Sequence, residues 1–193
     1  MKIGKIIGRI FAVLFAVVLI LLLGRIFMMD DKGSLTEIVP TEAAKEAYAA
    51  QGKDAFVTHK LLKSLSADGY FSMHSLIYNE NSRELQITGR YNESVYKYWG
   101  VENGDEFYWE LRDSAGNTVS VGTVAEEEQK YFYRHFRLVF SDVVVAKEEP
   151  LYLFLCCDAV EYPTANTEGL PVHAAGQDWK LYKLSKQERS ALS

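Results

Sequence analysis

Two adjacent cysteines, Cys156 and Cys157, are the first residues whose types suggest chemistry, and they lie in the apolar stretch FLCCDAV. Neighbouring α-carbons are about 3.8 Å apart, whereas a disulfide usually spans about 4.4–6.8 Å, so a bond between these two residues would be strained. A metal site needs more ligands, and only Asp158 is close, with no C-x-x-C spacing. The sequence therefore predicts no disulfide and no metal site here.

In a strand, the two thiols point to opposite faces, because successive side chains alternate. Cys157 has the same parity as the leucines at 151, 153 and 155, so we expect it to pack in the core. Cys156 then lies on the other face, and the sequence leaves open whether the fold covers it.

Histidine is the next residue type that commonly does chemistry, and the chain has four, His59, His74, His135 and His173. They are scattered, and none lies in a recognisable metal or nucleophile motif. The chain has no G-x-S-x-G elbow and no glycine-rich phosphate loop after a strand. We therefore expect no catalytic residue and no cofactor, and the sequence predicts a protein that is not an enzyme.

Aromatic residues crowd one stretch of the chain, at Tyr91, Tyr96, Tyr98 and Trp99. Exposed aromatic rings can stack on sugar rings or anchor a protein partner. The alternative is that the same residues fill a β-sheet core and its rim. These four residues are the candidate binding patch that the sequence offers.

Charge narrows the classes of partner. Four of the 21 basic residues and none of the 26 acidic residues lie in residues 1–29, which leaves 17 basic and 26 acidic residues and a formal charge of −9 for the remainder. Nucleic-acid binding depends on basic side chains that displace counterions. An acidic domain is a poor candidate for it, so we expect no nucleic acid partner.

The N-terminal segment is basic at its start and apolar after it. Lys2, Lys5 and Arg9 precede an apolar stretch that runs over residues 10–29, interrupted only at 24–25. Twenty residues span a bilayer. A cleaved signal peptide has a similar start but needs a small-x-small cleavage site, and the following GRIFMMDDK has none. We favour an uncleaved anchor that contacts the lipid bilayer through residues 10–29, with the N-terminus cytoplasmic by the positive-inside rule and the C-terminal part outside the cell membrane.

The remaining elements follow from local patterns. Residues 30–40 read as a polar tether, and Thr41 and Gly52 are placed to cap and end a helix over residues 42–51. About seven strands follow, in the ranges 69–78, 83–91, 106–112, 118–124, 131–140, 151–162 and 177–184, with a solvated connection over 126–130 and a loop over 163–176. Short turns without βα alternation predict a mainly β domain over residues 41–193, an antiparallel immunoglobulin-like sandwich with an N-terminal helical segment.

Several segments together suggest a family: PTEAAKEAY, GYFS, LQITGRYN, FYWELRDSAGN, FRLVF and LYLFL. With the basic start and single anchor, they resemble uncharacterised membrane-anchored proteins of Gram-positive, Clostridia-type bacteria. The resemblance implies a bacterial cell-envelope setting and a β-sandwich, and it carries over no catalytic residue. We expect a non-enzymatic module that binds or scaffolds another envelope protein. The alternative is a glycan-binding module that uses the aromatic patch.

Overall fold

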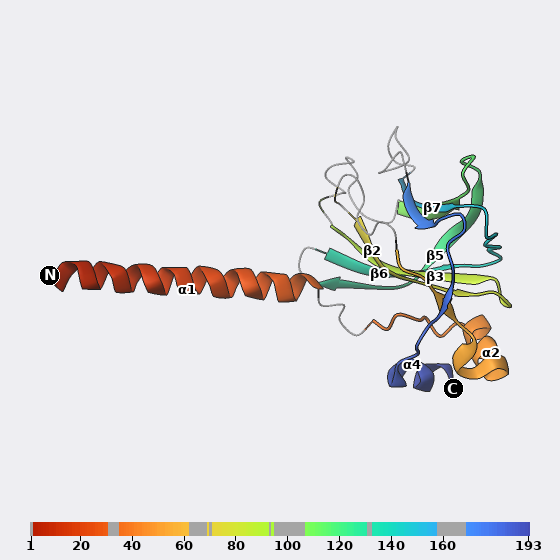
Figure 1. The fold of residues 1–193 in the computed structure, drawn as a ribbon, viewed down its shortest axis with the longest axis horizontal. Coiled ribbons are helices and arrows are strands. Elements are labelled where there is room, and N and C mark those ends of the chain that lie inside the picture. The colour runs from red at the N-terminus through yellow and green to blue at the C-terminus, as the bar shows by residue number, and fades with distance from the viewer. Residues whose placement is uncertain are drawn as a thin grey trace.

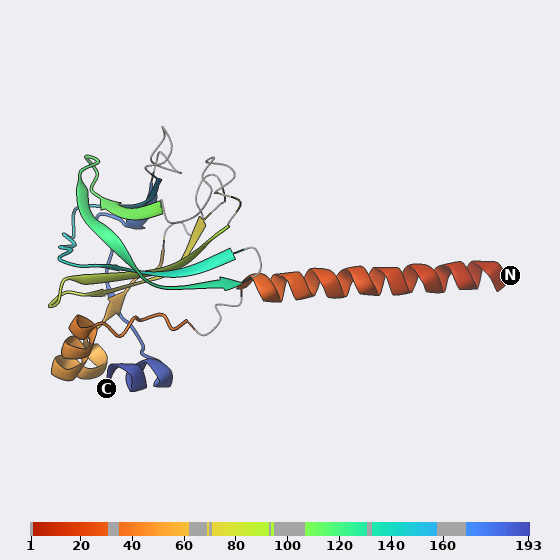
Figure 2. The same ribbon diagram turned by 180° about the vertical axis from the view of Figure 1, so that it is seen from behind.

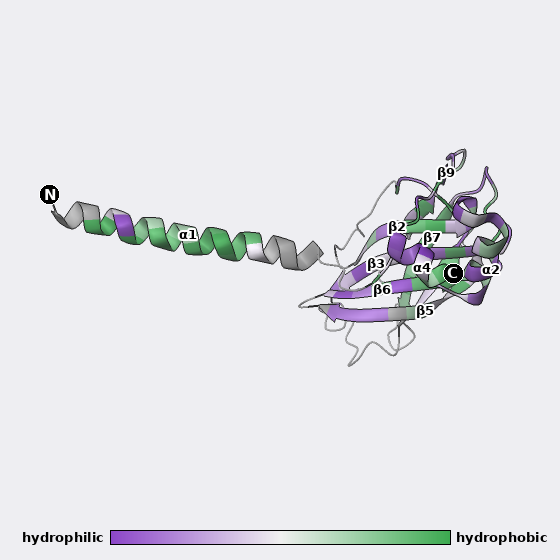
Figure 3. Ribbon diagram, turned by 90° about the horizontal axis from the view of Figure 1, so that it is seen from below, coloured by the Kyte–Doolittle hydropathy of each residue, from purple (hydrophilic) through white to green (hydrophobic). Residues whose placement is uncertain are grey.

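The computed structural model of the chain describes residues 2–30, 35–61, 69, 71–92, 94, 107–130, 133–157 and 169–193. Figure 1 shows a long helix, α1 (Lys2–Asp30), projecting from a β-rich body that carries two short helices on one side. Within α1, Ile6–Gly24 has a mean hydropathy of 3.0 and is wholly unburied, and by length and composition it can cross a membrane. Figure 3 colours most of the ribbon of this stretch green, for hydrophobic residues. The expected apolar N-terminal helix is therefore confirmed.

The body is one antiparallel sheet of nine strands in the order β8-β7-β4-β5-β6-β3-β2-β1-β9. Their bounds are β1 (Val57–Thr58), β2 (Phe71–Asn79), β3 (Glu84–Asn92), β4 (Phe107–Arg112), β5 (Thr118–Lys130), β6 (Tyr133–Phe140), β7 (Leu151–Cys157), β8 (Leu170–His173) and β9 (Lys180–Leu181). Burial alternates along β4, because Trp109 and Leu111 are buried while Tyr108 and Glu110 are half-buried. The expectation of a mainly antiparallel β fold is confirmed.

Strand β5 joins two arms of this sheet. Its first residues pair with β4 and its later residues pair with β6, with a register shift between Val124 and Glu126. We call β4, β7 and β8 the first arm, and β1, β2, β3, β6 and β9 the second arm. Figures 1 and 2 show β5 curving from one arm to the other, so that the sheet curls over itself. The fold is thus a single curled sheet.

The concave side of the curl holds the main core. Large buried side chains come from both arms, among them Leu85, Ile87, Phe136, Leu138, Trp109, Leu111, Leu153 and Leu155. Fully burying a side chain of this size stabilises the fold by about 1.5–3 kcal/mol. Because the two arms share this core, neither can be removed without exposing the other.

Three strand boundaries differ from those expected. Residues 126–130 belong to β5 because they pair with β6, whereas the sequence predicts a solvated connection there. Residues 170–173 form β8 against β7 inside the expected loop. The expected last strand over 177–184 shrinks to the two residues of β9, and an unexpected helix, α4 (Lys186–Leu192), follows with a capping box between Ser185 and Glu188.

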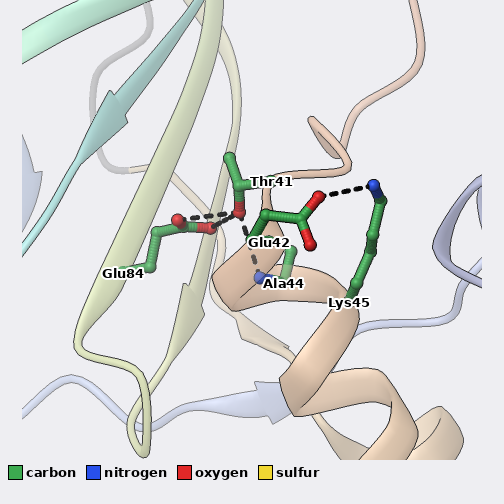
Figure 4. Close-up of polar contacts among 5 residues, drawn as sticks. All are labelled: Thr41, Glu42, Ala44, Lys45 and Glu84. Atoms are coloured by element: carbon green, nitrogen blue, oxygen red, sulfur yellow. Dashed lines mark hydrogen bonds and ion pairs between the residues drawn. The ribbon is translucent and has the colours of Figure 1, made fainter.

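Helix α2 (Glu42–Gln51) has the expected bounds. The backbone N–H of Ala44 donates to the Thr41 hydroxyl over 3.0 Å, and that hydroxyl donates to the Glu84 carboxylate over 2.9 Å (Figure 4). The helix ends at Gly52, whose φ of +64° favours glycine, and a 3-10 turn, η1 (Gly52–Asp54), follows. The cap therefore fixes α2 to β3 as well as starting it.

The convex face of the second arm is covered by α2, α4 and residues 35–41. We call residues 35–41 the docked segment. A second apolar cluster forms there from Ile38, Ala44, Ala47, Ala55, Phe56, Ile77 and Leu192. The sequence predicts a tether over residues 30–40, but Ile38 and Val39 are buried. The prediction is wrong for residues 35–40, because their backbone groups find partners on the sheet.

Candidate functional site

A surface pocket of about 440 Å³ lies at the end of the body formed by the turn after β2 and the segments around β8 and β9. Its lining residues are Val57, Tyr78, Glu80, Val145, Lys147, Gln177, Asp178 and Trp179. Two of them are aromatic and three are charged. We call this the Trp179 pocket.

The ring of Trp179 is held in place by three other rings. His173 stacks on it at a centroid distance of 5.3 Å with 8° between the planes, and His59 lies 4.5 Å away. Tyr78 lies at 5.4 Å, and its hydroxyl donates to the Val143 carbonyl over 3.0 Å. Burial raises the pKa of Tyr78, so its hydroxyl stays protonated. A wall fixed in this way loses little conformational entropy when a ligand binds.

Behind Trp179, His59 and His173 form a buried hydrogen-bonded pair. His59 Nδ1 lies 3.4 Å from the carbonyl oxygen of Lys60, and His59 Nε2 lies 3.1 Å from His173 Nδ1. A carbonyl only accepts, so Nδ1 of His59 carries its proton and Nε2 is the acceptor. His173 Nδ1 must then donate, which leaves a lone pair on His173 Nε2. That atom is buried and has no hydrogen-bond partner among the described residues.

This hydrogen bond requires His59 Nε2 to be unprotonated, and burial disfavours a charge on either ring. Burial lowers the pKa of His59, with a smaller lowering from His173 and an opposing effect of the Lys60 carbonyl. Burial also lowers the pKa of His173. The pair therefore links the edge of β8 to the segment after β1 while both rings are uncharged.

The rim of the pocket carries charges of both signs. Lys147 Nζ lies 3.9 Å from Asp178 Oδ1, and both side chains are largely exposed. Such a pair contributes little to stability in water, so both groups are available to a ligand. Gln177 fixes the loop that carries them, because its amide donates to the Lys60 carbonyl over 2.7 Å and accepts from the Ala174 N–H over 3.1 Å. Chemically, the pocket offers an aromatic wall for stacking and paired charges for polar recognition.

A buried polar cluster on the convex face is the second concentration of charge. Arg137 donates to the carbonyl oxygens of Thr36 and Ile38 over 2.8 and 3.0 Å. Burial lowers the pKa of Arg137, while Glu37 and Glu188 oppose this. These hydrogen bonds join Arg137 of β6 to the backbone of residues 35–41, so the cluster fastens the docked segment to the sheet.

The structure places only one of the four residues of the predicted aromatic patch. Tyr91 is 3% exposed, its hydroxyl donates to Glu127 over 3.2 Å, and its ring lies 6.1 Å from that of Phe136. It is a core residue and cannot stack on a ligand from solution. Tyr96, Tyr98 and Trp99 lie outside the described residues, so their role stays a prediction.

Cys156 is buried with no exposed surface. Its sulfur lies 3.8 Å from Nη2 of Arg112, whose guanidinium covers the Phe154 ring at 4.5 Å. The fold therefore covers the face that the sequence left open. The side chain of Cys157 lies outside the described ones. No group of three or more His, Cys, Asp or Glu suited to a metal ion occurs within the described parts of the chain.

Sequence reasoning missed the Trp179 pocket. His59 and His173 are 114 positions apart, so no local spacing connects them. Trp179 lies in a stretch that alternates like a strand, which hides its place beside a turn. Comparison of the chain with protein-family models, curated sequences and solved structures finds no match.

Proposed function

We propose that the chain is a single-pass membrane protein that holds its β-rich body on the extracytoplasmic side. The observation that carries this proposal is the apolar surface of α1, which no part of the described chain covers. Lys2, Lys5 and Arg9 before the span, against Arg25 and Lys32 after it, favour a cytoplasmic N-terminus. The proposed setting is the cell envelope of a Gram-positive bacterium.

The proposed role is non-enzymatic binding or scaffolding of another envelope protein. It is supported by the Trp179 pocket, where a fixed indole lies beside exposed Lys147 and Asp178. Trp is enriched at the centres of protein interfaces, and charges at a rim steer the partner. We also propose that the two arms of the curled sheet act as the two layers of an immunoglobulin-like sandwich. The core that the two arms share supports this.

In-cell photo-crosslinking tests this role. A benzophenone amino acid replaces Asp178 at the pocket rim or Lys45 on α2, which is also exposed. The proposal predicts a discrete crosslinked product from position 178 that is absent from position 45. The variants Trp179→Ala and Lys147→Glu should each reduce it at least tenfold. The same products from both positions, or products that survive both substitutions, would contradict the proposal.

Glycan binding is the second candidate, and the Trp179 pocket favours it over the patch around Tyr91. Trp179 supplies a ring face, and Glu80 and Asp178 supply hydrogen-bond acceptors for hydroxyl groups. A glycan array distinguishes the candidates, because glycan binding by the full chain in detergent should disappear in Trp179→Ala. Binding that persists in that variant removes the pocket from this role.

A further inference from the structure

The docked segment changes how the body is held above the membrane. If residues 30–40 formed a free tether, the chain from Asp30 to Thr41 could extend about 37 Å. In the structure only residues 31–34 separate the end of α1 from the docked segment. Fully extended, they let Leu35 lie at most about 17 Å from the end of α1.

The docked segment is held by hydrogen bonds from one side of the sheet and from α4. Gln86 pairs with Val39 as a backbone peptide would, accepting from its N–H over 2.7 Å and donating to its carbonyl over 3.0 Å. Thr88 donates to the Glu37 carboxylate over 3.0 Å, and the Glu37 N–H donates to Glu188 over 3.2 Å. With the contacts of Arg137 and the burial of Ile38, these bonds make the segment part of the body.

The same contacts fix the direction of the segment. Along β3, Thr88 contacts Glu37, Gln86 contacts Val39 and Glu84 contacts Thr41. The docked segment therefore runs opposite to β3. Its start, Leu35, points toward the end of the sheet where β3 and β5 finish and where β2 and β6 begin. We call this the proximal end.

The opposite end of the sheet is the distal end. It carries the turns at residues 80–83 and 113–117 and the Trp179 pocket. Strand β3 runs between the two ends beside the docked segment, and its nine residues extend about 26–30 Å. A surface at the distal end therefore lies further from Leu35 than the proximal end, by up to about the length of β3.

We propose that the docked segment holds the proximal end of the sheet against the lipid surface and presents the Trp179 pocket away from it. This inference rests on the proposed membrane anchor. The short connection enforces the orientation, and electrostatic attraction does not contribute, because the domain beyond residue 29 carries a formal charge of −9 and anionic lipids repel it. The pocket is thereby positioned for a partner in the envelope and not for a lipid headgroup.

Energy transfer to the membrane tests the orientation in the full-length chain. The variants Gln129→Cys, at the proximal end of β5, and Ala115→Cys, in a distal turn, are both exposed sites. Each is labelled with a donor dye, and the protein is reconstituted in vesicles of neutral and anionic phospholipid that contain a headgroup-labelled acceptor. The wild-type chain, treated in the same way, gives the background from its own cysteines.

We expect transfer at least threefold more efficient from Gln129→Cys than from Ala115→Cys, with no change between 50 mM and 500 mM salt. Insertion of eleven Gly and Ser residues between Asp31 and Lys32 should make the transfer efficiencies from the two sites equal. Equal transfer from the two sites without the insertion, or loss of the difference in high salt, would overturn the inference. A chain that does not float with the vesicles contradicts the anchor itself, whereas a chain that floats but shows equal transfer contradicts the orientation alone.

Discussion

Among single residues, the histidine pair shows best how burial sets chemistry. His59 and His173 are neutral partners because each ring nitrogen between them has one fixed role, one donating and one accepting. Protonation of either ring would put a hydrogen on both facing nitrogens or place a charge in a buried site. Trp179 packs against both rings of this pair, so we expect protonation of the pair to change the geometry of the Trp179 pocket.

The pH dependence has a defined sign. Burial lowers the pKa of His59 and of His173 below the value of about 6.5 that each has in the unfolded chain. The unfolded chain therefore binds more protons in acid, and the stability that the pair contributes is present above pH 6.5 and is lost as the pH falls below it. His173→Asn keeps a donor near the Nδ1 position and removes one titrating group. In urea unfolding monitored by tryptophan fluorescence in micelles, the wild type should lose more stability between pH 7.5 and pH 5 than the variant.

His74 and His135 are present in both proteins, so the difference between wild type and variant isolates the pair. An equal loss of stability in the two proteins would show that the histidine pair does not control it.

Cys156 gives a second prediction for a single residue. Since its side chain has no exposed surface and lies beside Arg112, a thiol reagent should react with it only after unfolding. In a Cys157→Ser variant, an aromatic disulfide reagent should label less than a tenth of the protein before denaturant is added. Rapid labelling of the folded chain would mean that the face opposite the leucines of β7 is open.

Alternation of apolar and polar residues identifies the core-facing side of β4, where Trp109 and Leu111 are buried. The sequence left open whether Cys156 is covered, and it placed Tyr91 in a candidate binding patch; both are buried, on strands covered on both sides by other parts of the fold. Such covering comes from segments distant in sequence and leaves no local pattern. The pocket residues His59 and His173 were out of reach for the same reason.

Among the elements, α2 was predictable to the residue, since its capping groups Thr41 and Gly52 act locally. The end of β5 was not, because its run of glutamates resembles a solvated connection. In the sheet, Glu128 pairs across from His135 and Glu127 bonds Arg134 over 3.1 Å, and β6 thereby accommodates the acidic residues. Cross-strand pairs between opposite charges stabilise a sheet modestly and explain why the strand continues.

Gly122 lies where β5 passes from one arm to the other. A Cβ atom at this position would lie 2.6 Å from the Phe140 ring, which is buried in the core. Gly122→Ala should therefore destabilise the folded chain by about 1–3 kcal/mol, as overpacking does. Urea unfolding in detergent micelles measures this, with the exposed Thr123→Ala as the control. Equal stability of the two variants would mean that the arms do not close over Phe140.

Gln86 tests the docked segment. Gln86→Leu keeps the volume but leaves the buried N–H of Val39 without its partner, while the Val39 carbonyl still accepts from the Thr41 N–H. Leaving the buried N–H unpaired costs about 2 kcal/mol. The same unfolding measurement checks it. Gln187→Leu, on an exposed position of α4, is the matched control and should change stability by less than about 0.5 kcal/mol. An unchanged stability in Gln86→Leu would contradict docking.

At the scale of the whole molecule, one apolar helix and one acidic body divide the chain into parts that suit different solvents. The body has a core of its own, whereas Ile6–Gly24 has no apolar partner among the described residues. The sequence predicted this division from composition alone. It did not predict how short the connection is, because Ile38 and Val39 find their partners on β3 and β6, far along the chain.

Thiol accessibility in intact cells tests the proposed topology most directly. Full-length chains with Ala115→Cys or Lys5→Cys are treated with a membrane-impermeant maleimide before and after lysis, beside the wild-type chain as background. We predict that Ala115→Cys is labelled in intact cells and that Lys5→Cys is labelled only after lysis. The two labelled chains should have the same size on a gel, because the anchor is not cleaved from the body. Labelling of Lys5→Cys in intact cells, with Ala115→Cys protected until lysis, would contradict an extracytoplasmic body.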